Sequence, residues 1–425
     1  MASLNLRTVR TVAVPALAGI TICCGFTRVA EAQGGGSDCA SLAARGAAPA
    51  LPTKFPVVIP FTMRQNHVAI TVCRAGKTFT FTLDTGAGSS NFDMNTAKDA
   101  GVTLGDGFRV GGAGTGSVAG ARIVDAVEIP GAGLSIPLSM AIDYSGLSAS
   151  SGAAPEGLVG ADFLSRYVVA VSYLKHTLTF YDRESFAYAG PGAVVPVTFS
   201  GPFIRIPADI TLLDGSAISG TFLVDLGSSL PLALSTHFVN ANRLKERLGS
   251  TVTRPGGRGV GGVSMVDVGR IAKLSIGKVT LPQVITMLHS ETSGAFGNPA
   301  LGDGNIGGDI LRRFVVFLDY KRKQLILEPH EGFAEPFEAD MSGLQLSIGT
   351  DRTRYSVDYV VAKSPAAEAG FMEGDAVTAV DGVAVTPALL DELRIRLRQP
   401  DQKLTFTVVR GSNTIVLPVV TRRIV

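Results

Sequence analysis

Tryptophan is absent from this chain of 425 residues, and histidine occurs only five times. The five histidines are scattered, without the H-E-x-x-H pattern of zinc peptidases, and the four cysteines form no Cys/His zinc pattern. Charged residues make up 17% of the chain, the formal net charge is +2, and no long basic block occurs. The sequence therefore argues against a metal site and against nucleic-acid binding.

Long apolar runs are also missing after residue 32, so no later segment is expected to cross a bilayer. The first 32 residues have the order of a signal peptide: Arg7 and Arg10, an apolar stretch at 11–26, and the small-x-small string Ala30-Glu31-Ala32. We expect residues 1–32 to be removed and the protein to be exported, to the periplasm or outside the cell. An uncleaved membrane anchor is the alternative.

Two of the four cysteines lie in the predicted signal peptide, which leaves Cys39 and Cys73. An oxidising compartment permits a disulfide between them, closing 73 − 39 = 34 residues. The sequence alone does not show that the two cysteines meet. It also does not show whether residues 33–55 are a linker or a short propeptide.

Glycine, in contrast, is abundant, with 50 residues, and valine and threonine fall in short runs. This composition favours a mainly β chain with many turns. The length predicts two or three domains rather than one.

An internal repeat carries most of the information. The string Phe-Thr-Leu-Asp-Thr-Gly-Ala contains Asp84 after three strand-like residues. The similar string Phe-Leu-Val-Asp-Leu-Gly-Ser contains Asp225 at the same place, 225 − 84 = 141 residues later. Alternating apolar residues precede both strings, at 67–72 and 203–208, and glycine-rich loops follow them. These loops lie at 110–116 and 256–262. We call the two units the first copy (56–190) and the second copy (191–335).

The two copies also end alike. Leu158-Val159-Gly160 in the first copy corresponds to Asn305-Ile306-Gly307 in the second, and strand-like runs at 177–181 and 324–327 close the copies. Two ordinary β units explain the strands, but they do not explain an Asp-x-Gly at the same place in each.

This arrangement suits acid–base chemistry. Hydrolysis of a peptide bond needs a base to activate water and an acid to protonate the leaving nitrogen. Two carboxylates held about 3 Å apart cannot both ionise, so one supplies the base and the other the acid. Gly86 and Gly227 allow the sharp turn that presents each carboxylate.

The string at Asp84, with Thr85 and Gly86, resembles the active-site signature of retropepsin-like and pepsin-like aspartic proteases. The triplet at 158–160 and the looser one at 305–307 resemble the segment that crosses behind the catalytic turn in that family. The resemblance covers roughly residues 56–330. It implies two β-barrel lobes, a cleft between them, endopeptidase activity with Asp84 and Asp225 as the catalytic pair, and no cofactor.

One residue departs from the family pattern. A hydroxyl normally follows each catalytic aspartate and the two hydroxyls brace the pair, but Leu226 follows Asp225. The sequence predicts a one-sided brace, or a brace completed by Ser228 or water.

Two alternatives stay open: a non-catalytic peptide-binding protein that keeps the fold, and a homodimer that pairs Asp84 across chains.

The C-terminal residues follow another pattern. We expect strands at 342–348 and 374–382, a short helix at 364–370, a second helix at 387–398, and a final hairpin at 404–417. The string S-P-A-A-E-A-G…G-D…V-D-G resembles a PDZ domain of the kind appended to bacterial envelope proteases. This implies a peptide site at Gly343, Leu344, Gln345 and Leu346, with a protein or peptide partner. Gln345 replaces the glycine usual in that loop, which weakens the expectation of carboxylate capture.

The sequence thus predicts a mainly β chain: two retropepsin-like acid-protease β-barrel lobes followed by a PDZ-like α/β module. The expected domains are a signal peptide (1–32), a linker or short propeptide (33–55), lobe 1 (56–190), lobe 2 (191–335) and a PDZ-like domain (336–425). The expected site comprises Asp84 and Asp225, supported by Thr85, Gly86, Leu226, Gly227 and Ser228.

Overall fold

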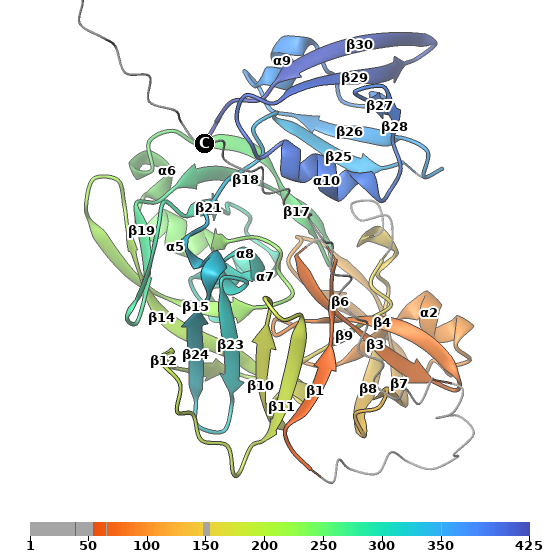
Figure 1. Ribbon diagram of the computed structural model, residues 1–425, viewed down its shortest axis with the longest axis vertical. Helices are drawn as coiled ribbons and strands as arrows, with labels where there is room; N and C mark the ends of the chain where they lie inside the picture. Colours follow the sequence, from red (N-terminus) through yellow and green to blue (C-terminus); the bar gives the residue numbers. More distant parts are fainter. Residues whose placement is uncertain (1–38, 40–53, 65, 148–153, 350) are drawn as a thin grey trace, which may run out of the picture. The chain divides into compact units, whose positions relative to one another are not determined.

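The structure is a computed structural model that describes residues 39, 54–64, 66–147, 154–349 and 351–425. The predicted signal peptide at 1–32 lies outside these residues, as does most of the predicted linker at 33–55. Strands dominate the described chain, and its helices are short (Figure 1). No helix in the described ranges is long and apolar enough to cross a membrane.

The first copy folds around one eight-stranded sheet with the order β2-β3-β4-β9-β5-β8-β7-β6. An additional pairing between β3 and β7, at Cys73 and Glu128, brings two strands together that are distant in this order. The strands are β2 (Thr62–Arg64), β3 (His67–Arg74), β4 (Lys77–Leu83), β5 (Asn91–Asp93), β6 (Gly107–Gly111), β7 (Ser117–Ile129), β8 (Leu134–Ile142) and β9 (Gly157–Val159).

The second copy repeats this arrangement, with the path β17-β18-β21-β16-β22-β15-β14-β19-β20 and β13 beside β14. In each copy the strand that leads to the aspartate pairs in parallel with a short strand from the end of the copy: β4 with β9, and β15 with β22. The strands are β13 (Thr198–Ser200), β14 (Phe203–Thr211), β15 (Ala217–Asp225), β16 (Leu232–Leu234), β17 (Val252–Gly259), β18 (Gly262–Arg270), β19 (Lys273–Ile276), β20 (Val279–Pro282), β21 (Ile285–Leu288) and β22 (Gly304–Gly307).

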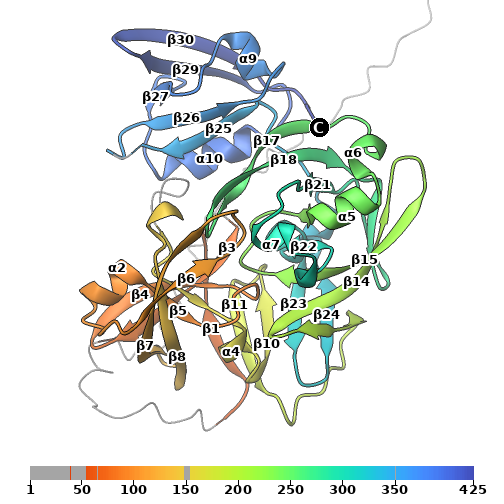
Figure 2. The ribbon, with the colours of Figure 1, turned by 180° about the vertical axis from the view of Figure 1, so that it is seen from behind.

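A third sheet joins the two copies, with three strands from each in the order β1-β11-β10-β23-β24-β12 (Figures 1 and 2). Its centre is the antiparallel pair β10–β23, in which Ala170 lies opposite Phe317. The strands are β1 (Val57–Pro60), β10 (Tyr167–Ser172), β11 (Thr177–Asp182), β12 (Ala193–Pro196), β23 (Phe314–Asp319) and β24 (Gln324–Pro329). This continuous ladder of hydrogen bonds makes the two copies one unit.

One hydrophobic core runs through both copies, and we call it the first core. It forms because apolar side chains alternate along the strands, as Val68, Ile70 and Val72 do in β3, all of them at most 1% exposed. Short helices connect the strands; α2, for example, is capped by the Asp93 carboxylate, which accepts from the Thr96 amide. The helices are α2 (Met94–Asp99), η1 (Ser145–Leu147), α4 (Ala161–Leu164), α5 (Thr236–Ala241), α6 (Leu244–Arg247), α7 (Gly294–Gly297), η2 (Pro299–Leu301), α8 (Gly308–Leu311) and η3 (Glu331–Ala334).

The C-terminal residues form a separate six-stranded sheet with two helices and their own hydrophobic cluster, the second core. The sheet order is β25-β26-β27-β29-β30, with β28 beside β27, so β25 is an edge strand. The elements are β25 (Leu344–Ile348), β26 (Tyr355–Val360), α9 (Pro365–Ala369), β27 (Ala376–Val380), β28 (Val383–Ala384), α10 (Leu389–Arg396), β29 (Lys403–Arg410) and β30 (Asn413–Val420).

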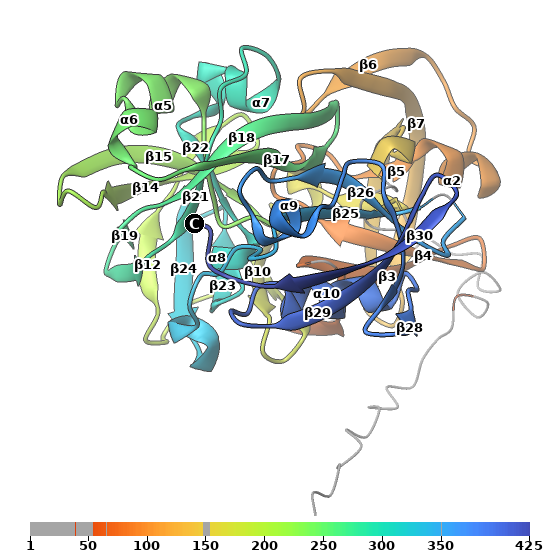
Figure 3. The same ribbon diagram turned by 90° about the horizontal axis from the view of Figure 1, so that it is seen from above.

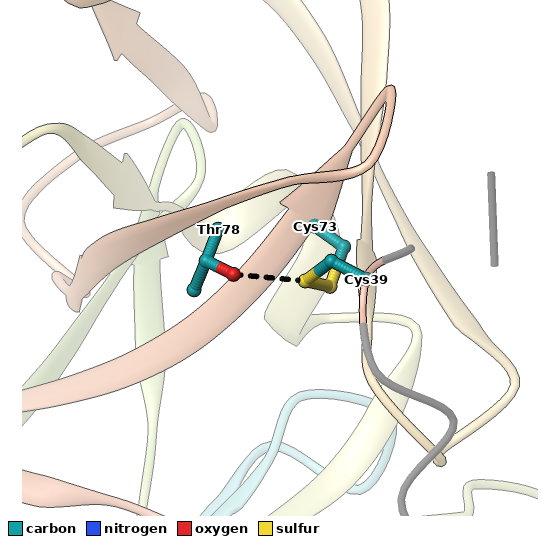
Figure 4. The surroundings of a disulfide bond; sticks show 3 residues. All are labelled: Cys39, Cys73 and Thr78. Carbon is teal, nitrogen blue, oxygen red and sulfur yellow. Dashed lines mark hydrogen bonds between the residues drawn. A yellow bond between two sulfur atoms is a disulfide. The ribbon is translucent and has the colours of Figure 1, made fainter. Parts of the chain in front are cut away.

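The two cysteines left open by the sequence are joined by a disulfide, Cys39–Cys73, with a Cα–Cα distance of 5.3 Å (Figure 4). The Thr78 hydroxyl on β4 donates to the Cys39 sulfur at 3.2 Å. The bond therefore ties residue 39 to β3 in the sheet of the first copy.

Candidate functional site

The two aspartates occupy equivalent places in the two copies. Asp84 follows the last residue of β4, and Asp225 is the last residue of β15. The amide of Gly86 donates to Asp84 Oδ1 at 2.8 Å, and the amide of Gly227 donates to Asp225 Oδ1 at 3.0 Å. Each turn thus folds back on its own carboxylate and fixes one of its oxygens in the same way.

The structure brings these two turns together from sequence positions 141 residues apart. The carboxyl group of Asp225 lies within hydrogen-bonding reach of the Asp84 carboxylate. The approach is so close that a Cβ atom on Gly227 would overlap the Asp84 carboxyl carbon, and one on Gly86 would lie 3.0 Å from Asp225 Oδ1. Glycine is therefore required at position 227, where any side chain would push the two carboxylates apart.

Both carboxyl groups hold protons more tightly than a free aspartate. Burial raises the pKa of Asp84, opposed by the hydrogen bond from the Gly86 amide and by the electrostatic interaction with His67. Burial and then repulsion from Asp84 raise the pKa of Asp225 to about 8, although hydrogen bonds from Gly227 and Asn305 favour its ionised form. The two carboxyl groups therefore differ in the contacts that oppose the rise in their pKa values, and the proton affinity of each depends on the charge of the other.

The brace behind the pair comes from Thr85, on the side of the first copy, which is one of the arrangements that the sequence left open. The Thr85 hydroxyl is fully buried; it donates to the Val224 carbonyl at 2.5 Å and accepts from the Leu226 amide at 3.0 Å. The side chain of Leu226, which is 1% exposed, offers no polar atom in return. The Ser228 hydroxyl instead accepts from the Leu230 amide at 3.4 Å.

Asn305 is a site residue that the motif analysis did not identify. It lies on β22, and its Nδ2 donates to Asp225 Oδ2 at 2.7 Å, the oxygen that Gly227 does not bind. The only signal in the sequence was the difference between the two triplets, with Asn305 where the first copy has Leu158. The difference did not show that the Asn305 side chain reaches Asp225, because this contact depends on the register between β15 and β22.

The glycine-rich loops form the tips of two β-hairpins, β6–β7 and β17–β18, which can be followed in Figure 3. The tips contact each other: the Gly114 amide donates to the Val260 carbonyl and the Gly116 amide to the Gly261 carbonyl, both at 2.9 Å. A third segment joins them, because the Ala295 amide of α7 donates to the Gly112 carbonyl at 2.9 Å. One hairpin from each copy therefore meets the other through backbone hydrogen bonds.

The predicted peptide site at 343–346 lies at the start of β25, and its first two amides already have partners. The Asp340 carboxylate accepts from the Gly343 amide at 2.6 Å, and the Ser342 hydroxyl accepts from the Leu344 amide at 3.0 Å. Leu344 and Leu346 point into the second core. The amides of Gly343 and Leu344 are thus engaged within the chain, and the peptide site at 343–346 stays a prediction.

Residues 336–409 match the family model of the PDZ domain. The match contains β25 to most of β29, while β30 extends the same sheet beyond it. The predicted PDZ domain is thus confirmed, and a PDZ domain binds peptides or protein partners. No curated protein matches the chain. Among the described residues, no group of three or more His, Cys, Asp or Glu side chains is placed to hold a metal ion.

Proposed function

With the PDZ domain as the premise, we propose that the rest of the chain is an aspartic endopeptidase whose catalytic pair is Asp84 and Asp225. The meeting of these two carboxyl groups supports the proposal most directly. They come from equivalent turns of two copies, lie within hydrogen-bonding reach, and both have a raised pKa. A buried, proton-sharing carboxylate pair is costly for stability and is typical of sites that perform acid–base chemistry.

In the proposed reaction the ionised carboxylate takes a proton from a water molecule, and the water oxygen forms a bond to the peptide carbonyl carbon. The protonated carboxyl group gives its proton to the carbonyl oxygen, which yields a neutral gem-diol. The C–N bond breaks when the carboxyl group that is now protonated gives its proton to the amide nitrogen. One hydroxyl of the gem-diol returns a proton to the pair in the same step. The products are an amine and a carboxylic acid, and the pair regains its single proton.

The hairpins and the PDZ domain have complementary roles in this proposal. The two hairpin tips would open to admit an extended peptide and close again over it, excluding water from the reacting bond. The PDZ domain would recruit or orient the protein substrate through a segment bound beside the edge strand β25. The partners are then unfolded or extended protein segments.

The predicted export of the protein belongs to the same proposal. The Cys39–Cys73 disulfide supports it, because such bonds persist in the periplasm and outside the cell rather than in the reducing cytosol. The periplasm or the extracellular space is therefore the proposed location of the enzyme.

A homodimer that pairs Asp84 across chains has less support than a single-chain site. Within one chain Asp225 already occupies the place that a second Asp84 would take. The six-stranded sheet also joins the two copies of one chain through hydrogen bonds. The single-chain proposal predicts activity per molecule that does not change with enzyme concentration.

A non-catalytic peptide-binding protein is the second candidate function, and two observations favour it. Leu226 removes half of the brace behind the pair, and the PDZ domain alone accounts for peptide binding. This candidate predicts that peptides bind but are not cleaved.

The deciding experiment uses the exported form of the full chain and a reduced, carboxymethylated protein as an unfolded substrate. We expect cleavage that a statine-type transition-state mimic inhibits, and a loss of at least about 1,000-fold in kcat for Asp84→Asn and for Asp225→Asn. Circular dichroism checks that both variants stay folded. Full activity in folded Asp84→Asn would refute the proposal. Activity that is lost in Asp84→Asn but retained in Asp225→Asn would favour the homodimer.

A further inference from the structure

Asn305 makes the two carboxylates unequal. It lies on β22, where it is paired with Leu223 of the parallel strand β15 and with Ala233 of the antiparallel strand β16. Its side-chain amide reaches Asp225 Oδ2 at 2.7 Å and is partly buried. A charge-assisted hydrogen bond of this length to a carboxylate is stronger than one between neutral groups.

The first copy has no such donor at the corresponding place. Leu158 on β9 is paired with Thr82 of the parallel strand β4 and with Asn91 of the antiparallel strand β5. Leu158 therefore holds the same position in the first sheet as Asn305 holds in the second. A leucine side chain donates no hydrogen bond. The same strand position therefore holds a hydrogen-bond donor in the second copy and an apolar side chain in the first.

Asn305 and the Gly227 amide together bind both oxygens of Asp225. One bond comes from the turn that carries Asp225, and the other comes from β22, 80 residues further along the chain. A carboxylate held at both oxygens cannot rotate about its Cβ–Cγ bond without losing a hydrogen bond. The restraint acts on Asp225, the aspartate that is followed by Leu226 and therefore lacks its hydroxyl brace.

We propose that Asn305 is a positioning residue that fixes the Asp225 carboxylate toward Asp84 and stabilises its ionised form, compensating for the brace that Leu226 cannot supply. The proposal rests on the proposed peptidase function, but the restraint on Asp225 is measurable without catalysis. Burial and repulsion from Asp84 raise the pKa of Asp225 to about 8, and the hydrogen bond from Asn305 acts against that rise. Without the donor, Asp225 keeps its proton to a higher pH.

The first measurement is the pH dependence of kcat/KM and kcat for the full chain with the carboxymethylated protein substrate. In Asn305→Leu, which copies the first copy at this position, we expect the alkaline limb to move up by roughly one pH unit. We also expect kcat to fall by about tenfold with little change in KM, because Asn305 acts on Asp225 rather than on the substrate.

Two further variants separate hydrogen bonding from packing. Asn305→Ala removes the volume of the side chain together with the Nδ2 donor, whereas Asn305→Leu keeps a similar volume and removes the donor. A pure packing role predicts a shift of the alkaline limb in Asn305→Ala alone; we expect shifts of similar size in both variants. Asn242→Leu is the matched control, since Asn242 is a part-buried asparagine of the second copy whose Nδ2 donates to the Phe238 carbonyl at 2.9 Å. We expect no shift of the pH profile in that variant.

The second measurement is an NMR titration of the aspartate side-chain carboxyl carbons in ¹³C-labelled protein, with the Asp225 signal assigned from its loss in Asp225→Asn. We expect a higher pKa for Asp225 in Asn305→Leu than in the wild type. An unchanged Asp225 pKa would overturn the inference, whether or not the protein is active. A raised pKa in a protein that cleaves no substrate would instead retain the inference and refute the peptidase function.

Discussion

At the scale of single residues, the pair is held by three kinds of contact that differ in origin. The amides of Gly86 and Gly227 act alike in both copies, Thr85 braces the second turn from the first copy, and Asn305 binds Asp225 from a later strand. The pair is thus symmetric in its backbone and asymmetric in its side chains. The asymmetry is concentrated at Asp225, where Leu226 removes one contact and Asn305 supplies another.

Thr85→Val tests the one-sided brace. The substitution keeps the shape of the side chain but leaves the Val224 carbonyl and the Leu226 amide, both bonded to the Thr85 hydroxyl, without that partner. We expect a loss of roughly 2 to 4 kcal/mol in the free energy of unfolding, measured with urea. The control is Thr286→Val, because the buried Thr286 hydroxyl makes one bond, to the Val284 carbonyl, and its loss costs less. Equal losses in the two variants would contradict the bracing role.

Asp225→Asn tests the electrostatics of the pair through stability. Because burial and repulsion from Asp84 raise the pKa of Asp225 to about 8, the folded state binds a proton that the unfolded state releases near pH 4. The stability linked to this proton is full below about pH 4 and is lost as the pH rises toward 8. We expect Asp225→Asn to match the wild type near pH 4 and to exceed its free energy of unfolding by about 1 kcal/mol or more at pH 8.

Asp375→Asn is the control of opposite sign for this titration. Burial alone would raise the pKa of Asp375, but hydrogen bonds from Arg410 outweigh it, and the pKa is lowered. The Asp375 carboxylate therefore stabilises the fold above the usual aspartate pKa and loses that effect in acid. We expect Asp375→Asn to destabilise the protein at pH 8 and much less near pH 3. A parallel response of the two variants would contradict the electrostatic assignment.

The sequence predicted part of this site. Asp84 and Asp225 were identifiable because each ends an apolar lead-in and precedes a glycine, and the repeat related them. Asn305 was not, because its contact joins positions 80 apart and depends on which side of β22 faces β15. The role of Asp340 was missed for a similar reason, since a carboxylate in a loop shows no partner until the amide of Gly343 is placed beside it.

At the scale of elements, the strand predictions that followed alternation are confirmed: 67–72 lies in β3, 177–181 in β11 and 324–327 in β24. The helices predicted at 364–370 and 387–398 are α9 and α10. Pairing across the copies was not predictable, because the register of β10 against β23 leaves no local pattern in either strand. That pairing is nevertheless what makes the two copies one unit.

Gly114→Ala tests the contact between the hairpin tips. A Cβ atom at position 114 would overlap the carbonyl carbon of Gly261, so the two tips must separate. We expect the amides of Gly114 and Gly116, which donate to Val260 and Gly261, to exchange with solvent at least about tenfold faster in hydrogen-exchange NMR. Gly111→Ala is the matched control in the same hairpin, since a Cβ atom there meets nothing within 4 Å. Slow exchange retained in Gly114→Ala would show that the tips do not depend on this contact.

At the scale of the whole molecule, the two largest hydrophobic cores divide the described chain, and the division does not coincide with the family match. Phe337 lies within the match at 336–409 but is 2% exposed in the first core. The buried Arg313 guanidinium stacks on its ring at 3.6 Å and donates to the Pro336 carbonyl at 3.3 Å. The predicted boundary at residue 336 therefore cuts through a packed cluster, and the second core begins only at Leu344.

Two matched substitutions test this division in the full chain. Phe337→Ala removes a ring from the first core and Phe406→Ala removes one from the second, where Phe406 is fully buried. Each is expected to cost about 3 to 5 kcal/mol in the unit that contains it. In hydrogen-exchange mass spectrometry, Phe337→Ala should accelerate exchange in β23 and β24 and leave β29 and β30 unchanged, while Phe406→Ala should do the reverse. Faster exchange in β29 and β30 in Phe337→Ala would instead show that residues 336–343 fold with the PDZ domain.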